Sequence, residues 1–228
     1  MSARRVLLTG AGRGIGRAVA LAFAREGAAL ALLARSRDEL EAVAEEVHEL
    51  GGAAHVLTVD LASASAITAA CEEALAALGG GLDVLVNNAG IFDVCPIEQL
   101  TLELWERFLA INLTAPMLVT QASLLGLAVG REPVAIFIAS IAAETGFPGN
   151  TAYCASKYGL RGFADALREE LAPRGIAVRS VYPRGTDTTI FDAVEGDWDR
   201  ASMDLPESVA ELVLLASRAG ARSDLRMP

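Results

Sequence analysis

Short apolar runs alternate with longer stretches rich in Ala, Leu and Glu along almost the whole chain. The runs have the length of buried β-strands, and the longer stretches show the apolar period of amphipathic helices. Strands that are apolar on both faces and separated by helices indicate βαβ units, in which helices cover both faces of a parallel sheet. The sequence therefore predicts an α/β fold with a doubly wound parallel sheet of about seven strands.

The expected elements follow one another without interruption. We expect strands at residues 4–9, 28–33, 53–59, 82–87, 134–139 and 176–182, and a short edge strand at 224–227. We expect helices at residues 14–26, 37–50, 64–78, 102–127, 151–172 and 207–219. Because no linker, repeat or low-complexity tract divides the series, residues 1–228 are expected to form a single domain.

The composition narrows the classes of function. The formal net charge is −10, whereas a general nucleic-acid binder is more often basic. Cys71, Cys95 and Cys154 are widely spaced, so neither a disulfide framework nor a metal site is expected. No apolar stretch approaches the roughly 20 residues of a membrane span, and the N-terminus lacks a signal-peptide pattern. We therefore expect a cytoplasmic protein without a nucleic-acid or membrane partner.

The first expected strand ends in a glycine-rich turn that leads directly into a helix. Glycines permit positive φ and close backbone approach, and the N-terminus of a helix favours a pyrophosphate. A turn of this kind after the first strand of an α/β series indicates a dinucleotide site, the alternative being a structural turn without a ligand. Its candidate contacts are Gly10, Gly12, Arg13, Gly14, Ile15 and Gly16.

The end of the second expected strand distinguishes between two cofactors. An acidic residue there would hold the ribose 2′-hydroxyl of NAD. This chain instead has Arg35 and Ser36, with no carboxylate before Asp38. Arg35 and Ser36, joined by Arg13 and Arg37, can bind a 2′-phosphate, unless these arginines are merely solvated. The sequence therefore predicts NADP(H).

Further motifs follow the later strands. Asp60-Leu61 ends the third strand, Asn87-Asn88-Ala89-Gly90 the fourth, and Ser140 follows the fifth; Tyr153-Cys-Ala-Ser-Lys157 opens the next helix. Together with the glycine turn, this ordered series resembles the short-chain dehydrogenase/reductase family over nearly the whole chain. The resemblance implies an extended Rossmann-type sheet and a catalytic tetrad of Asn112, Ser140, Tyr153 and Lys157. It also implies cofactor contacts, for which the candidates are Asp60, Leu61, Asn87, Ala89, Gly90, Tyr153, Lys157, Pro183, Thr186 and Thr188.

Tyr153 and Lys157 also have a physical case of their own. They are four residues apart on a helix and so share a face. A free Tyr has a pKa of about 10, and we expect the nearby ammonium, joined by an oxidised nicotinamide, to lower the pKa of Tyr153. Tyr153 can then act as general acid or base, while the Ser140 hydroxyl binds the substrate oxygen. Taken alone, a Tyr and a Lys at this spacing usually form a surface pair. Because Ser140 and the glycine turn are also present, we interpret the pair as part of a catalytic site.

Pro116 suggests a role for the backbone of Asn112. Proline lacks an N–H and cannot bond the carbonyl four residues back, so the Asn112 carbonyl is left free within a helix. A buried carbonyl needs a partner, and an ordered water is one. The family pattern has a proton relay through water to this Asn. We hypothesise that Pro116 frees the carbonyl for that water, the alternative being an ordinary proline kink.

The last third of the chain departs from the family pattern and leaves the substrate open. Pro183-Arg184-Gly185 stands where Pro-Gly is usual, so the nicotinamide-side contacts are less certain. The candidates for the substrate pocket and a short lid are Phe92, Cys95, Ile141, Glu144, Phe147, Ile190, Phe191 and Trp198.

Three classes of function remain open from the sequence. The first is an NADP(H)-dependent reductase acting on a small carbonyl or alcohol; a ketone or aldehyde reductase, a sepiapterin reductase-like enzyme and a 3-oxoacyl reductase-like enzyme are all compatible with it. The second is a catalytically silent NADP(H)-binding regulator or redox sensor, and the third is a structural subunit. We expect a homodimer or homotetramer.

Overall fold

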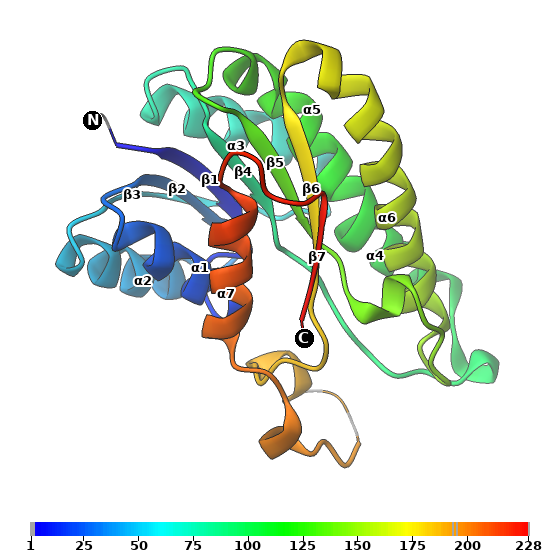
Figure 1. The fold of residues 1–228 in the computed structure, drawn as a ribbon. Coiled ribbons are helices and arrows are strands. Elements are labelled where there is room, and N and C mark those ends of the chain that lie inside the picture. The colour runs from blue at the N-terminus through cyan, green and yellow to red at the C-terminus, as the bar shows by residue number, and fades with distance from the viewer. Residues whose placement is uncertain (1–2, 193, 195, 228) are drawn as a thin grey trace.

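Seven parallel strands form one sheet in the computed structural model, which describes residues 3–192, 194 and 196–227. The strand order within this part of the chain is β3-β2-β1-β4-β5-β6-β7 (Figure 1). The strands are β1 Arg5–Thr9, β2 Ala29–Ala34, β3 Ala53–Thr58, β4 Val84–Asn87, β5 Val134–Ile138, β6 Ala177–Tyr182 and β7 Asp224–Arg226.

Helices cover both faces of the sheet. One layer contains α1, α2 and α7, and the opposite layer contains α3, α4, α5 and α6 (Figure 1). The helices are α1 Gly14–Ala24, α2 Arg37–Glu49, α3 Ala64–Ala77, α4 Leu102–Leu109, α5 Ala115–Ala128, α6 Thr151–Leu171 and α7 Pro206–Ala216. The predicted α/β fold with a doubly wound parallel sheet is therefore confirmed.

Alternation along the strands divides the core into two halves. In β1, Val6 and Leu8 face the layer of α1 and α7, while Leu7 faces the layer of α3 and α5. All three side chains are fully buried, because a central parallel strand has no solvent face. This two-sided burial is the reason that the strands read as continuous apolar runs.

The predicted long helix at residues 102–127 contains a local change of register. A π-helical turn, Ala110–Thr114, separates α4 from α5, and the Ala115 N–H donates to the Ala110 carbonyl five residues back. Pro116 then lies in the first turn of α5, where a missing N–H is tolerated. The turn is therefore a π-bulge within an otherwise continuous helix, a feature often found at functional sites.

The helical run from α4 to α5 is long and apolar enough to be compared with a membrane-spanning helix. By length and composition alone, Leu102–Ala128 is the one described helix that could cross a membrane. In the fold it packs on the sheet beside α3 and α6, so Val119 and Leu127 are buried in the core. Buried helices of soluble proteins meet the same criteria.

The strand order creates a crevice at the carboxyl ends of the central strands β1 and β4. The chain runs outward from β1 through β2 to β3 and then crosses back to β4, which pairs with β1. The loops after β1 and β4 therefore leave side by side at the carboxyl ends of the strands. Ligands of open α/β sheets bind at such a point.

Candidate active site

A cavity of about 550 Å³ lies at the carboxyl ends of the strands. The glycine turn, the end of β2, the loops after β4 and β5 and the first turns of α6 line it. Most of the predicted site residues are among its lining: Gly10, Gly12, Arg13, Gly14, Ile15, Gly16, Arg35, Ser36, Leu61, Ala89, Gly90, Ser140, Tyr153, Lys157, Pro183, Thr186 and Thr188.

The glycine turn is packed too closely for side chains. An ideal Cβ on Gly16 would lie 1.9 Å from the Gly10 carbonyl oxygen, and one on Gly10, whose φ is +65°, would lie 2.9 Å from Ala89 Cα. Asn88, which sequence reasoning did not single out as a contact, holds the turn: its Nδ2 donates to the carbonyls of Thr9 (3.0 Å) and Gly10 (3.1 Å). The turn thus keeps its backbone bare toward the cavity, as a pyrophosphate site requires.

The end of the cavity beside β2 contains charges of both signs. Arg35 is exposed, lines the cavity and forms no ion pair with any described residue. Ser36 caps α2 by accepting a hydrogen bond from the Glu39 N–H (3.3 Å). The Glu39 carboxylate turns to Arg13, with Oε1 3.7 Å from Nη1, and it also lines the cavity. Arg37 pairs with Glu41 instead and does not line the cavity.

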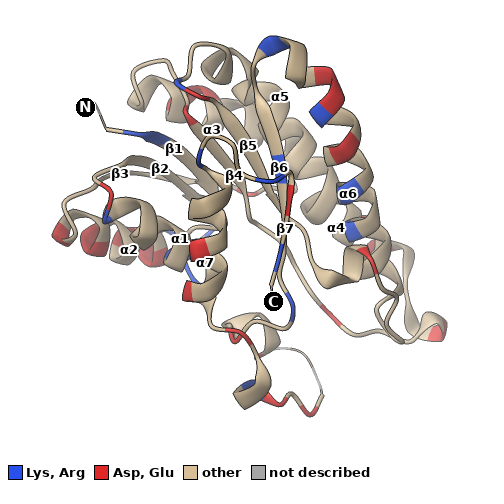
Figure 2. Ribbon diagram, viewed as in Figure 1, with Lys and Arg blue, Asp and Glu red and all other residues tan. Residues whose placement is uncertain are grey.

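Sequence reasoning missed Glu39, although a signal was present. Ser36 and Glu39 have the spacing of a capping box, in which the acidic side chain reaches back to the N-cap. Here the Ser36 half of the box is formed, while the carboxylate lies against Gly12, where a Cβ would be 2.9 Å from Oε2. An acidic group is therefore part of the site, on the exposed acidic face of α2 (Figure 2).

Tyr153 and Lys157 lie on the first turns of α6 and face the same cavity. Lys157 Nζ donates to the Ile138 carbonyl at 2.9 Å and lies 5.8 Å from the centroid of the Tyr153 ring. Burial lowers the pKa of Lys157 to about 8. Burial also raises the pKa of Tyr153, and the hydrogen bond with Ser140 opposes this without cancelling it. The expected lowering of the Tyr153 pKa is thus not found in the protein alone, because desolvation of the phenolate outweighs its neighbours.

Ser140 lies directly after β5 and begins a short 3₁₀ helix, Ile141–Ala143. Its hydroxyl accepts a hydrogen bond from the Ala142 N–H at 3.1 Å and also interacts with the Tyr153 side chain. The Ile141 N–H donates to the Pro183 carbonyl at 2.9 Å. The predicted pair of hydroxyls is therefore brought together in the wall of one cavity.

Asn112 lies in the π-bulge, behind the cavity wall rather than in it. It is fully buried, its Oδ1 accepts from the Ile91 N–H (2.8 Å), and its Nδ2 donates to Ser156 Oγ (3.1 Å). An ideal Cβ on Gly90 would be 3.3 Å from Asn112 Oδ1 and 3.7 Å from Lys157 Nζ. A Cβ at Gly90 would thus crowd Asn112 Oδ1 and come into ordinary contact with Lys157 Nζ.

Asp60 and Asn87 are the other predicted contacts that do not line the cavity. Asp60 is exposed, and its Oδ1 accepts from the Ala62 N–H at 3.0 Å within its own turn. Asn87 is buried, and its Nδ2 donates to Thr120 Oγ1 at 3.1 Å, which joins β4 to α5. Among the substrate-side candidates, Cys95 and Glu144 likewise do not line it, whereas the remaining six do.

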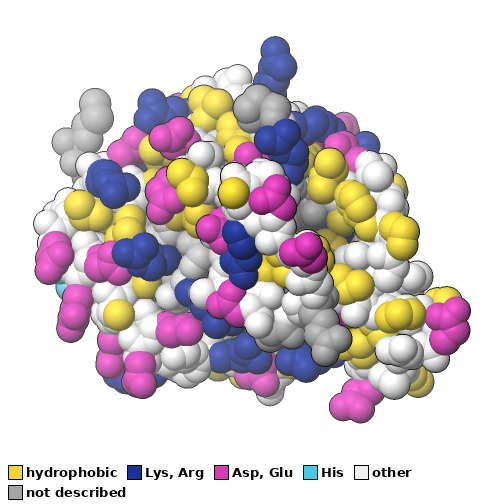
Figure 3. All heavy atoms as spheres, turned by 90° about the horizontal axis from the view of Figure 1, so that it is seen from below, with side chains coloured by type: hydrophobic (Ala, Val, Ile, Leu, Met, Phe, Trp, Pro, Cys, Tyr) yellow, Lys and Arg dark blue, Asp and Glu magenta, His cyan; other side chains and the backbone are white. Residues whose placement is uncertain are grey.

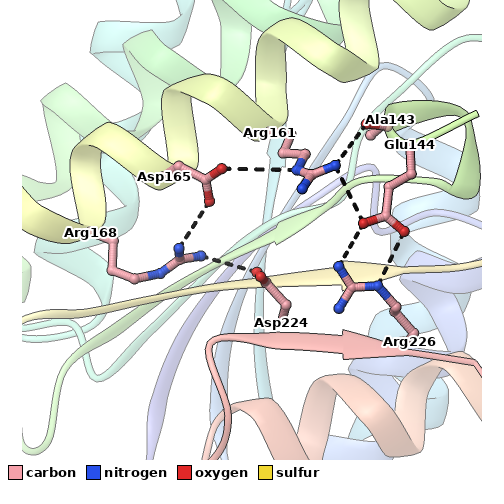
Figure 4. A network of polar contacts seen from close by, with 7 residues as sticks. All are labelled: Ala143, Glu144, Arg161, Asp165, Arg168, Asp224 and Arg226. Carbon is pink, nitrogen blue, oxygen red and sulfur yellow. Dashed lines mark hydrogen bonds and ion pairs between the residues drawn. The ribbon is translucent and has the colours of Figure 1, made fainter.

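Alternating charges connect Ala143 and Glu144, which follow Ser140 in the chain, with α6 and β7 (Figure 4). Glu144, next to the 3₁₀ helix, accepts from Arg226 of β7 and pairs with Arg161 of α6 at 3.4 Å. Arg161 also donates to the Ala143 carbonyl. Contacts among Arg161, Asp165, Arg168 and Asp224 complete the connection from α6 back to β7. We call these six charged residues the charge ring.

Comparison with known proteins shows which family the chain is similar to. The family described as short chain dehydrogenase matches residues 4–198. The 3-oxoacyl-[acyl-carrier-protein] reductase FabG of Aquifex aeolicus is 39% identical over 80% of this chain and 73% of its own length. D-threitol dehydrogenase of Mycolicibacterium smegmatis is 36% identical over 84% of this chain and 75% of its own. A short chain dehydrogenase of Burkholderia cenocepacia in complex with NADP is 32% identical, with a TM-score of 0.89, and the match covers 98% of this chain and 96% of that one.

Proposed function

This chain belongs to the short-chain dehydrogenase family and is an oxidoreductase, and on that premise we propose that it interconverts a carbonyl and an alcohol with NADP(H), with Tyr153 as general acid and base. The observation that carries the proposal is the meeting of Ser140, Tyr153 and Lys157 at one end of a cavity whose other end is the glycine turn. One domain would supply both halves of the site.

The lining fits a phosphorylated dinucleotide. The closely packed glycines would leave the backbone free for the pyrophosphate, and Arg35, Ser36 and Arg13 would bind the 2′-phosphate. Thr188 lies against Gly14 of the glycine turn, where an ideal Cβ would be 3.1 Å from Thr188 Cγ2, and Thr186 also lines the cavity. These two threonines would therefore bind the phosphates and the nicotinamide carboxamide. When bound, the cofactor supplies or accepts the hydride.

The side chains of this protein would handle the proton. Tyr153 would give its phenolic proton to the carbonyl oxygen in reduction and take it back in oxidation, while Ser140 holds that oxygen. The raised pKa of Tyr153 keeps the phenol protonated before reduction. The Lys157 ammonium then stabilises the phenolate, since it lies on the same helix face and faces the same cavity.

We further propose that the π-bulge takes part in resupplying this proton. In this turn the Ala115 N–H donates to the Ala110 carbonyl, five residues back. Pro116 has no N–H to donate to the Asn112 carbonyl, four residues back, so this carbonyl would be free to bind a water. A water bound there would connect Asn112 to Lys157 past Gly90. A high-resolution structure with no water at the Asn112 carbonyl would contradict this relay.

The central experiment replaces Tyr153 by Phe and follows NADPH oxidation with a panel of carbonyls. We expect kcat to fall about a thousandfold, because a general acid contributes roughly 10²–10⁴ in rate. NADPH affinity, measured by calorimetry, should change less than about twofold, because the ring remains. Tyr158→Phe is the matched control, since Tyr158 is exposed on the same helix.

Two results would contradict the proposal. Retained turnover in Tyr153→Phe would remove Tyr153 from the proton step. Equal or higher kcat/KM with NADH in the native enzyme would contradict the preference for NADP(H). NADPH binding without turnover of any carbonyl or alcohol would instead favour the silent regulator.

Assembly and location belong to the same proposal. Leu102, Leu125 and Val129 of the α4–α5 run are 70%, 82% and 65% exposed, and exposed apolar side chains of this size mark interfaces. We propose a homodimer or homotetramer acting in the cytoplasm on small molecules. A monomer in sedimentation at micromolar concentration would contradict the assembly.

A further inference from the structure

The substrate end of the cavity is dominated by aromatic rings. The ring of Phe92 lies 5.0 Å from that of Tyr153, nearly perpendicular to it at 83°. The rings of Phe191 and Trp198 lie 5.2 and 5.8 Å from Phe92 and 5.0 Å from each other. We call Phe92, Phe191 and Trp198 the aromatic cluster; all three line the cavity directly beside the proposed proton donor.

Neighbouring residues hold the rings of the cluster in place, and the indole N–H of Trp198 is hydrogen-bonded within the protein. Trp198 Nε1 donates to the Val194 carbonyl at 3.0 Å, so the indole presents mainly its apolar surface to the cavity. The Arg200 guanidinium lies 5.5 Å from the centre of the Phe191 ring and is itself bonded to Asp187 at 2.7 Å. The cluster is therefore a supported surface rather than a set of loose side chains.

The polar side chains that line this end are largely engaged within the protein: Thr186 Oγ1 donates to the Arg184 carbonyl at 3.2 Å, and Thr188 Oγ1 accepts from the Ile190 N–H at 3.4 Å. Besides Lys157, the cation that lines it is Arg184, which forms two hydrogen bonds to the Asp204 carboxylate at 3.1 and 3.3 Å. The Asn150 amide donates to the Pro148 carbonyl at 3.0 Å. A polyhydroxylated substrate would thus leave most of its hydroxyls without partners, at a cost in binding.

The surface around the mouth is equally unsuited to an anionic carrier. Seen from the side of the carboxyl ends of the strands, the acidic and basic side chains of the described residues are interspersed (Figure 3). The whole chain has a net charge of −10. A substrate attached through a phosphate-bearing arm would meet repulsion over distance, and Arg184 and Arg200 at this end are already paired with carboxylates.

We propose that the substrate is an uncharged ketone or aldehyde that carries an aryl ring a short apolar spacer away from the carbonyl, here called an aryl ketone, with the carbonyl at Ser140 and Tyr153 and the ring packed on the aromatic cluster. Aromatic rings attract one another in edge-to-face and offset arrangements beyond the effect of buried area, and the perpendicular rings around Phe92 offer such edges and faces. The inference rests on the proposed function, because it places the carbonyl by means of Tyr153.

The test compares ketones matched in size and intrinsic reactivity. 4-Phenylbutan-2-one and 4-cyclohexylbutan-2-one carry the same carbonyl two methylenes away from an aromatic or a saturated ring, and erythrulose represents polyhydroxy ketones. With NADPH, we expect kcat/KM for the aryl ketone to exceed that for the cyclohexyl ketone by about tenfold, and that for erythrulose by more, as a ring–ring contact and unpaired hydroxyls imply.

Substitution of each tryptophan shows whether the cluster is responsible. Trp198→Leu keeps apolar volume but removes the ring, and it should reduce the aryl preference to about twofold or less. The chain has two tryptophans, so Trp105→Leu is the matched control on α4, outside the cavity lining, and should keep the preference. In that variant Trp198 is the remaining indole, and quenching of its fluorescence reports ligand binding in the complex with oxidised NADP.

The outcomes separate the two claims. Equal rates with both ring ketones, or a preference for erythrulose, would overturn the aryl substrate and leave the carbonyl reductase intact. If no ketone is reduced, the proposed function fails. The quenching of Trp198 fluorescence in Trp105→Leu then tests whether the cluster binds an aryl ring. Quenching by the aryl but not the cyclohexyl ketone would support the aryl site, whereas no quenching by either would overturn it.

Discussion

Glu39 is an acidic residue at the place where we propose that a phosphate binds. Its carboxylate lines the end of the cavity proposed for the 2′-phosphate and lies 3.7 Å from Arg13. An anion there repels the phosphate and competes for the guanidinium, while it can accept bonds from an unphosphorylated ribose. Glu39 would therefore weaken the preference for NADP(H) that we propose for Arg35 and Ser36.

We predict that Glu39→Gln strengthens the binding of 2′,5′-ADP about fivefold and leaves that of 5′-AMP nearly unchanged. Removing one negative charge a few ångströms from a phosphate at a solvated site changes the interaction by about 1 kcal/mol. Titration calorimetry at low salt measures both affinities, and the difference should shrink as ionic strength rises. Glu41→Gln is the control, because Glu41 pairs with Arg37 instead. An equal gain for both nucleotides would show a general charge effect, not contact with the 2′-position.

Much of the candidate site could be predicted at the scale of single residues. Gly10 and Ser140 follow strand ends, and Tyr153 lies in the first turn of the helix after the fifth strand. Because the carboxyl ends of parallel strands lie along one side of the sheet, the order of these residues along the chain predicts that they meet there. Glu39 could not be predicted in this way, because a capping-box Glu can turn to the helix N-terminus or to a neighbouring loop. The close approach of Gly12 decides between these, and it is a tertiary contact.

At the scale of elements, the charge ring joins the last strand to the segment that carries Ser140. Arg226 binds Glu144, the residue directly after the Ile141–Ala143 turn that Ser140 begins, whereas Asp224 on the same strand binds Arg168 of α6 (Figure 4). The two residues thus belong to one strand and one network but act on different neighbours. This difference in contacts predicts a positioning role towards Ser140 for Arg226 but not for Asp224.

We predict that Arg226→Gln lowers kcat roughly threefold to tenfold with little change in the KM for NADPH, since small misplacements of a reacting group are costly. Asp224→Asn removes one charge from the same ring and should leave kcat unchanged. Thermal unfolding of both variants measures the structural effect, and we expect similar shifts. If both variants lose kcat in proportion to their loss of stability, the ring has no positioning role.

The π-bulge is a feature of the helices that the sequence pattern did not predict. The pattern of apolar residues predicts one helix over residues 102–127, and that helix is present. The extra residue in one turn leaves apolar periodicity almost unchanged over so short a length, so the bulge cannot be read from the pattern. Pro116 was the local signal, since it removes a backbone donor at the place where the register changes.

At the scale of the whole molecule, Asp83 fastens the end of the sheet opposite the site. It is fully buried just before β4 and accepts hydrogen bonds from the backbone and side chains of both Arg5 and Arg131. These residues begin β1 and the approach to β5, so one carboxylate joins three segments at the centre of the sheet. Burial alone would raise the pKa of Asp83, but the hydrogen bonds from Arg5 and Arg131 outweigh it and hold the pKa well below its usual range.

We predict that Asp83→Asn lowers the free energy of unfolding by about 2 kcal/mol at pH 7, since hydrogen bonds to a charged group contribute roughly 1.5–3 kcal/mol. Glu41→Gln breaks an exposed pair and should cost less than about 0.5 kcal/mol. A folded-state pKa below the unfolded value stabilises the fold above the unfolded pKa of about 4, and this stabilisation is lost as the pH falls further. The gap between the native protein and Asp83→Asn in urea unfolding should therefore be constant from pH 8 to 5 and narrow below about pH 4. An undiminished gap at about pH 3 would mean that Asp83 acts through its shape and not its charge.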